Sequence, residues 1–201
     1  EAQANTFQLI GEAFYKKQQT EGKSQATLDK TAYHLKLANA DFGRKPITEI
    51  SAPMVLRCLR KQEAKGNHET AHRLRARIGS VFRFAIASGL AESDPTLALK
   101  DALIRPNRKH RAAITDRNAL GGLMREIAGF DGQATTRIAL QLLAITAQRP
   151  GEIRQAKWQE FNFPERMWSL PAAKMKMRRE HNVPIPDQAM ALLDELRMIT
   201  G

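Results

Sequence analysis

Cysteine is nearly absent from this sequence. Its single thiol, Cys58, excludes an internal disulfide and any zinc cluster built on several cysteines. Because Cys58 lies in the apolar pattern of the segment MVLRCLRK, we expect it to be a buried structural thiol. No set of carboxylates, histidines or cysteines has the spacing of metal ligands, so we expect neither a metal nor another cofactor.

Long hydrophobic runs are missing as well. The longest apolar stretches are short and flanked by charges, which argues against a membrane-spanning helix and a membrane partner. No signal-peptide pattern opens the sequence, so we expect a cytoplasmic location.

Aromatic and acidic residues are scarce. Aromatic side chains make up 6% of the chain, and the lack of a stacking platform argues against an RNA-binding protein. Acidic residues number 21 against 32 lysines and arginines, which gives a net charge of +11. Such a surface attracts polyanions. Both halves of the chain are basic, which suggests two domains with one polyanionic partner.

What is present is a series of amphipathic helical patterns, rich in alanine and leucine. Thr6 is expected to begin the first helix, over residues 6–19. Ser24 begins a second helix, which runs to about Leu37. A third helix starts at Ser51 and ends at Gly66.

The fourth helix has the clearest pattern, from Asn67 to the terminating Gly89. Several basic side chains lie mostly off its apolar stripe: His72, Arg73, Arg75, Arg77 and Arg83. A helix with one apolar and one arginine-rich face can lie along a DNA groove, although a solvated face would look the same. The predicted DNA contacts here are Lys65, His72, Arg73, Arg75 and Arg77.

A boundary follows this helix. Two prolines and a basic run place a linker at residues 101–113, between a domain over 1–100 and a second over 114–201. Arg108 and Lys109 in this linker are further predicted DNA contacts. Helices are then expected from Thr115 or Asp116 to about Ala128, and from Thr135 to Thr146.

After Trp158 the spacing of apolar residues changes from one typical of helices to one typical of strands. The segments EFNF, MWSL and HNVPIP predict a small antiparallel sheet, and DQAMALLDELRM predicts a final helix. A basic segment, residues 172–180, lies between two of these strands, where a hairpin can reach a phosphate or a minor groove. Its predicted DNA contacts are Lys174, Arg178 and Arg179.

Arg149 lies where one predicted helix ends and the next begins. A guanidinium at such a junction can present its planar fork of N–H donors to the two non-bridging oxygens of a phosphate. Glu152 follows at the start of the next helix, where a carboxylate suits the helix dipole and can orient the arginine. An ordinary surface arginine in a loop would have the same local sequence.

The order of these segments resembles the tyrosine recombinases, specifically the bacteriophage-type integrases of prophages and genomic islands. That family has a Thr-Gly-x-Arg-x-x-Glu-Leu-like segment, here residues 146–153, then a hairpin with a catalytic lysine, then a Val-Pro-Leu-like strand end, here 183–185. The stretch RLRARIGSVFRFAIASGL is typical of the family's helical domain. The resemblance covers nearly the whole chain.

The resemblance implies a mainly α fold with a small antiparallel β-sheet. It implies a helical core-binding (SAM-like) domain followed by the first half of an α/β catalytic domain. It also implies site-specific recombination through a 3′-phosphotyrosyl intermediate. Arg149 would be a catalytic arginine, supported by Glu152, and Lys176 the lysine general acid, with Lys174 as the alternative. The implied partner is double-stranded DNA, bound in the bacterial nucleoid by a dimer or tetramer, without a metal.

The family's His-x-x-Arg motif, later His or Trp, and nucleophilic tyrosine are expected after the hairpin, and no match occurs there. The literal match at residues 72–75 precedes Arg149, and we interpret it as a coincidence. The only tyrosines, Tyr15 and Tyr33, are expected to be core residues. We therefore expect a fragment that lacks the nucleophile and is inactive alone. Two alternatives stay open: a non-catalytic DNA-binding regulator, and a type IB topoisomerase-like enzyme.

Overall fold

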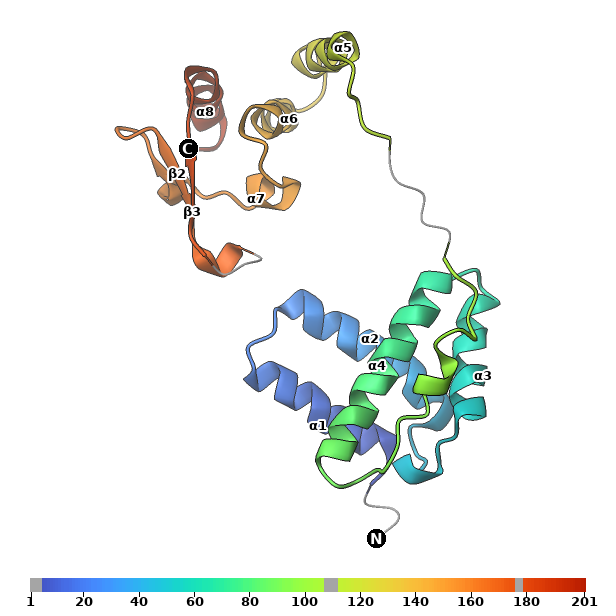
Figure 1. Cartoon of the computed structure of the whole chain (residues 1–201). Coiled ribbons are helices and arrows are strands. Elements are labelled where there is room, and N and C mark those ends of the chain that lie inside the picture. The colour runs from blue at the N-terminus through green and yellow to red at the C-terminus, as the bar shows by residue number, and fades with distance from the viewer. Residues whose placement is uncertain (1–4, 107–111, 176–178) are drawn as a thin grey trace. The chain divides into compact units, whose positions relative to one another are not determined.

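A computed structural model describes residues 5–106, 112–175 and 179–201 (Figure 1). The chain divides into two compact units, Glu1–His110 and Arg111–Gly201. The prediction of a mainly helical protein with a small antiparallel sheet is confirmed. Within the described ranges, no helix combines the length and the apolar character that crossing a bilayer requires.

The first unit is built from amphipathic helices whose apolar stripes meet in one core. Its helices are α1 (Phe7–Thr20), α2 (Gln25–Phe42), α3 (Ala52–Glu63) and α4 (His68–Ala87). Helix α1 begins as predicted, because the side chain of Thr6 accepts a hydrogen bond from the backbone N–H of Leu9. Helix α4 packs against the other three. The most completely buried large side chains of this core are Phe7, Ile47, Val55, Leu59, Leu74, Ile78, Val81 and Phe82.

Two helix ends differ from the sequence-based expectation. Helix α2 continues past Leu37 because Ala38 and Phe42 are buried in the core, so tertiary packing extends it. Helix α3 ends at Glu63, before Gly66, whose φ of 74° lies in the left-handed region.

The two tyrosines have different environments. Tyr15 packs against the core, as predicted. The same prediction was wrong for Tyr33, which is 50% exposed and contacts the ring of His34 at a centroid distance of 5.4 Å. Cys58 is buried, which confirms the prediction of a structural thiol. Burial raises the pKa of this thiol to about 12.

The segment after α4 folds back onto the first unit. The carboxylate of Asp94 accepts from Arg83 at 3.2 Å and from the backbone and hydroxyl of Thr96. Leu99 and Leu103 are buried in the same core. The first residues of the predicted linker therefore pack against the first unit.

The second unit combines helices with a three-stranded sheet. Its helices are α5 (Arg117–Ala128), α6 (Ala134–Thr146), α7 (Pro150–Arg154) and α8 (Asp187–Thr200), and its strands are β1 (Phe161–Asn162), β2 (Met167–Leu170) and β3 (His181–Pro184). Helix α5 begins and ends where the sequence predicted. Its start is fixed by Asp116, whose side chain accepts a hydrogen bond from the backbone N–H of Ala119. The sheet has the order β1-β2-β3, and both pairings are antiparallel. Helices α6 and α8 pack against each other. The buried core residues are Ile138, Leu142, Trp168, Leu170, Val183, Ile185, Ala189 and Leu193.

Candidate functional site

The junction between α6 and α7 brings a basic side chain to the surface. Helix α6 ends at Thr146, and its C-cap Ala147 has a left-handed backbone, with φ of 53° and ψ of 24°. Arg149 then adopts an extended backbone, which the following proline favours, and Pro150 occupies the first turn of α7. The chain thus reverses direction within a few residues and fixes the backbone of Arg149 on both sides.

Glu152 binds Arg149 at two points. One carboxylate oxygen accepts from the backbone N–H of Arg149 at 2.8 Å, which is one half of a capping box. The other oxygen accepts from the Arg149 guanidinium at 2.7 Å. The side chain of Glu152 is 9% exposed and that of Arg149 is 64% exposed. A buried carboxylate therefore orients an exposed guanidinium that retains donors for an anion.

The environment of Glu152 keeps it ionised. Burial alone raises the pKa of this carboxyl, but hydrogen bonds from the Arg149 backbone and side chain outweigh that effect. The charges of Arg149 and of His181, at the start of β3, lower it further, so the pKa lies below its ordinary value of 4.5.

The left-handed residue at this junction allows a stability test. We expect Ala147→Gly to raise the free energy of unfolding of the second unit by about 1 kcal/mol, because glycine adopts this backbone without a Cβ clash. Urea unfolding followed by tryptophan fluorescence measures this unit, since both tryptophans, Trp158 and Trp168, belong to it.

The matched control is the same substitution at the exposed Ala144 within α6. There glycine should lower the free energy of unfolding by about 0.5–1 kcal/mol, because it weakens a helix interior. Equal destabilisation by both changes would contradict a strained conformation at position 147.

Lys174 points into the second unit and not toward solvent. Its ammonium donates to the carboxylate of Glu160 and to the backbone carbonyl of Gln155, and its side chain is 22% exposed. Glu160 is 7% exposed and also accepts from the indole N–H of Trp168 at 3.2 Å. Burial raises the pKa of Glu160, yet the bonds from Lys174 and Trp168 outweigh it and the net shift is downward. Glu160 was not predicted from the sequence, where its only signal is a carboxylate among aromatic residues.

The other basic residues predicted before α4, in the linker and in the hairpin divide into two groups. Arg179 and Lys65 are exposed, as a DNA contact requires. The remaining predicted contacts and the predicted general acid lie outside the described residues: Arg108, Lys109, Lys176 and Arg178.

The basic side chains of α4 have partners within the first unit. Arg73 pairs with Glu69 at 3.0 Å, and Arg75 donates to the carbonyl of Thr96 at 3.2 Å. A ring nitrogen of His72 lies 3.0 Å from the carbonyl oxygen of Ile104.

Arg77 lies over the ring of Phe14, 5.9 Å from its centroid. Burial lowers the pKa of Arg77. The side chains of Arg75 and Arg77 are both only half-buried. The α4 side chains therefore bind partners on α1, on α4 itself and on the segment after α4, and their contact with DNA stays a prediction.

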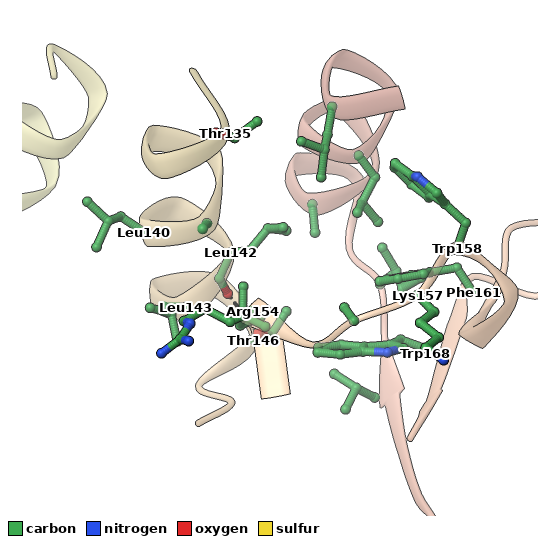
Figure 2. Close-up of a pocket in the computed structure, with 18 of the residues that line it drawn as sticks. Thr135, Leu140, Leu142, Leu143, Thr146, Arg154, Lys157, Trp158, Phe161 and Trp168 are labelled. Atoms are coloured by element: carbon green, nitrogen blue, oxygen red, sulfur yellow. Dashed lines mark hydrogen bonds between the residues drawn. The ribbon is translucent and has the colours of Figure 1, made fainter. Parts of the chain in front are cut away.

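A cavity of about 600 Å³ also lies in the second unit, lined by α6, α7, α8 and the sheet (Figure 2). Leu142, Trp158, Phe161 and Trp168 line it, with further apolar residues from both helices. Neither Arg149 nor Glu152 borders it. The cavity is thus mainly apolar and lies beside the exposed cationic site, since Pro150, Ile153 and Arg154 of α7 also line it.

Comparisons with known proteins agree over both units. The Phage integrase central domain model matches residues 7–102, and the Phage integrase family model matches residues 114–200. The integrase of Enterobacteria phage P4 is 32% identical over 172 residues, which are 80% of this chain and 39% of that protein. Prophage integrase IntA of Escherichia coli K12 is 30% identical over 201 residues, which are 100% of this chain and 48% of that protein. The chain spans less than half the length of these relatives.

Solved structures share the fold at lower identity. A lambda integrase (75–356) dimer bound to a COC′ core site has a TM-score of 0.75 at 19% identity, covering 98% of this chain and 71% of that chain. A lambda integrase tetramer bound to a Holliday junction also has a TM-score of 0.75, at 20% identity, covering 98% of this chain and 57% of that chain.

Proposed function

Since the chain belongs to the phage integrase family, we propose that it supplies the DNA-contacting and phosphate-binding parts of a site-specific tyrosine recombinase. The first unit serves as the core-binding domain and the second as the first half of the catalytic domain. The substrate is double-stranded DNA in the bacterial nucleoid, where copies assemble as dimers or tetramers. No metal takes part, because arginine and lysine supply the positive charge.

The orientation of Arg149 by Glu152 carries this proposal. The guanidinium is 64% exposed while its carboxylate partner is 9% exposed. A phosphodiester that approaches the surface therefore meets a cation of fixed direction. Charge that develops on the phosphoryl oxygens in the transition state strengthens its bonds to this guanidinium, which lowers the barrier.

The proposed reaction is a phosphoryl transfer in which one phosphate ester bond is exchanged for another. A tyrosine oxygen forms a bond to phosphorus and its phenol loses a proton to solvent, while the bond from phosphorus to the 5′ oxygen breaks. Lys176 donates a proton to that leaving oxygen. The result is a 3′-phosphotyrosyl link and a free 5′-hydroxyl, and attack by a second 5′-hydroxyl reverses the step on another strand.

A covalent adduct tests the proposal. The product of the whole reading frame is incubated with a DNA duplex that carries a nick shortly after the scissile phosphate. The short piece that bears the new 5′-hydroxyl then diffuses away, so the covalent adduct accumulates. Adducts are separated under denaturing conditions. A 3′-linked adduct supports the proposal. Relaxation of supercoiled DNA without joining of two sites would favour a topoisomerase, and tight DNA binding without any adduct would favour a regulator.

DNA affinity of the 201-residue chain itself is a further prediction. The net charge of +11 and several phosphate contacts should release condensed counterions on binding. With about five contacts, the slope of log K against log salt should be about −4.5. Fluorescence anisotropy between 50 and 300 mM KCl measures it. A slope near zero would contradict phosphate binding.

A further inference from the structure

Lys174, Glu160 and Gln155 form a polar link that the reaction above does not use; we call it the Lys174 bridge. The ammonium of Lys174 donates to the carboxylate of Glu160 and to the carbonyl of Gln155. The carboxylate is almost fully buried and also accepts from Trp168. A buried carboxylate is costly without partners, so the bridge is a preferred arrangement and not a random surface pair.

The bridge joins the two parts of the chain that carry the proposed cationic groups. Gln155 is the C-cap of α7, whose N-cap is Arg149. Lys174 ends the short turn after β2, and Lys176 follows it by two residues in the sequence. Lys174 thus connects the far end of the Arg149 helix to the chain immediately before the proposed general acid.

The same contacts argue against Lys174 as the proton donor. Its ammonium has two acceptors within the chain and only 22% of its side chain is exposed. A general acid must lie within hydrogen-bond reach of the leaving oxygen. Loss of a proton from Lys174 would also neutralise the ammonium and leave Glu160 buried without its cation.

We propose that Lys174 and Glu160 are positioning residues, which fix the start of the β2–β3 loop against α7 so that the general acid and Arg149 act on one phosphate. The inference rests on the proposed function and adds to it a residue pair with no direct contact to DNA. Misplacing a reacting group by about 1 Å costs about 100-fold in rate. Loss of the bridge should therefore slow the step that needs the proton, while binding of the phosphate by Arg149 continues.

Two DNA substrates separate positioning of the acid from general damage. One has the natural 5′ oxygen at the scissile phosphate and the other has sulfur at that bridging position. An alcohol, like water, has a pKa far above neutral pH, so it needs a proton to leave. A thiol ionises near a pKa of about 8.5 and leaves without one. A defect confined to proton donation therefore disappears with the sulfur substrate.

The expected results concern the product of the whole reading frame. Lys174→Met and Glu160→Gln should slow adduct formation on the oxygen substrate by about 10–100-fold, and their rates on the sulfur substrate should stay within about threefold of the unaltered protein. Lys174→Arg keeps a cation for Glu160 and should retain most of the oxygen-substrate rate. Glu165→Gln, in the exposed turn between β1 and β2, is the matched control and should behave as the unaltered protein.

Other outcomes overturn the inference. An unchanged oxygen-substrate rate in Lys174→Met would show that the bridge positions nothing. Equal losses on both substrates would show a structural role alone. A Lys174→Arg variant that is slow on oxygen and normal on sulfur would make Lys174 itself the acid.

Tryptophan fluorescence checks folding of each variant, and Glu160→Gln carries the comparison if Lys174→Met does not fold. Absence of adducts from the unaltered protein on both substrates would instead refute the proposed function, and the inference with it.

Discussion

We expect Arg149→Ala to lower the rate of adduct formation by about 10³-fold in the product of the whole reading frame, because one charged donor that acts on the transition state contributes about that much. The loss should be the same on the oxygen and sulfur substrates, since both transition states place charge on the non-bridging phosphoryl oxygens. DNA affinity should fall by less than about tenfold, because one phosphate contact among several is removed. Adduct formation is measured under single-turnover conditions with protein in excess.

Arg154→Ala is the control for this experiment. Arg154 is exposed on the same short helix and pairs with no carboxylate among the described residues. Its removal takes away the same charge without altering the Glu152 pair. If both variants lost activity equally, net charge and not the orientation of Arg149 would explain the effect.

Phe7→Ala should reduce the stability of the first unit by about 3–5 kcal/mol, the cost of removing a large aromatic side chain from a packed core. Phe7 is fully buried, and its ring meets that of Phe42 at 4.9 Å and that of Phe82 at 6.1 Å. The thermal midpoint of this unit should fall by at least about 12 °C. Far-UV circular dichroism reports the transition.

The second unit should not respond to this change, because its core is separate. Its two tryptophans provide the test: the fluorescence transition should keep its midpoint while the dichroism transition moves. Leu9→Ala, at a position on α1 that is 49% exposed, is the control, with an expected change within about 0.5 kcal/mol. A common shift of both transitions would show that the units unfold together.

Helix starts and the strand region were predictable because their signals are local. Asp116 caps α5 through a residue three positions along the chain. The end of α2 was not predictable in the same way, since burial of Phe42 depends on residues from other helices.

The proposed phosphate site was also predictable only in part. The pair of Arg149 and Glu152 lies within one helical turn, so the sequence was sufficient to suggest it. The partner of Lys174 was hidden, because Glu160 is 14 residues away and the fold brings the two together. On α4, Arg75 likewise meets Thr96 across 21 residues of intervening chain. An exposed arginine-rich face therefore resembles, in sequence, a face that packs against a returning segment.

The short span of the capping box has a consequence for how the site assembles. A bond between residues three apart closes almost no loop, so it can form as soon as a helical turn forms, within about a microsecond. The links of Lys174, across 14 and 19 residues, must wait for the sheet to pair. We therefore expect Arg149 to acquire its direction early in folding, and the lysine side of the site to be completed around an arginine that is already in place.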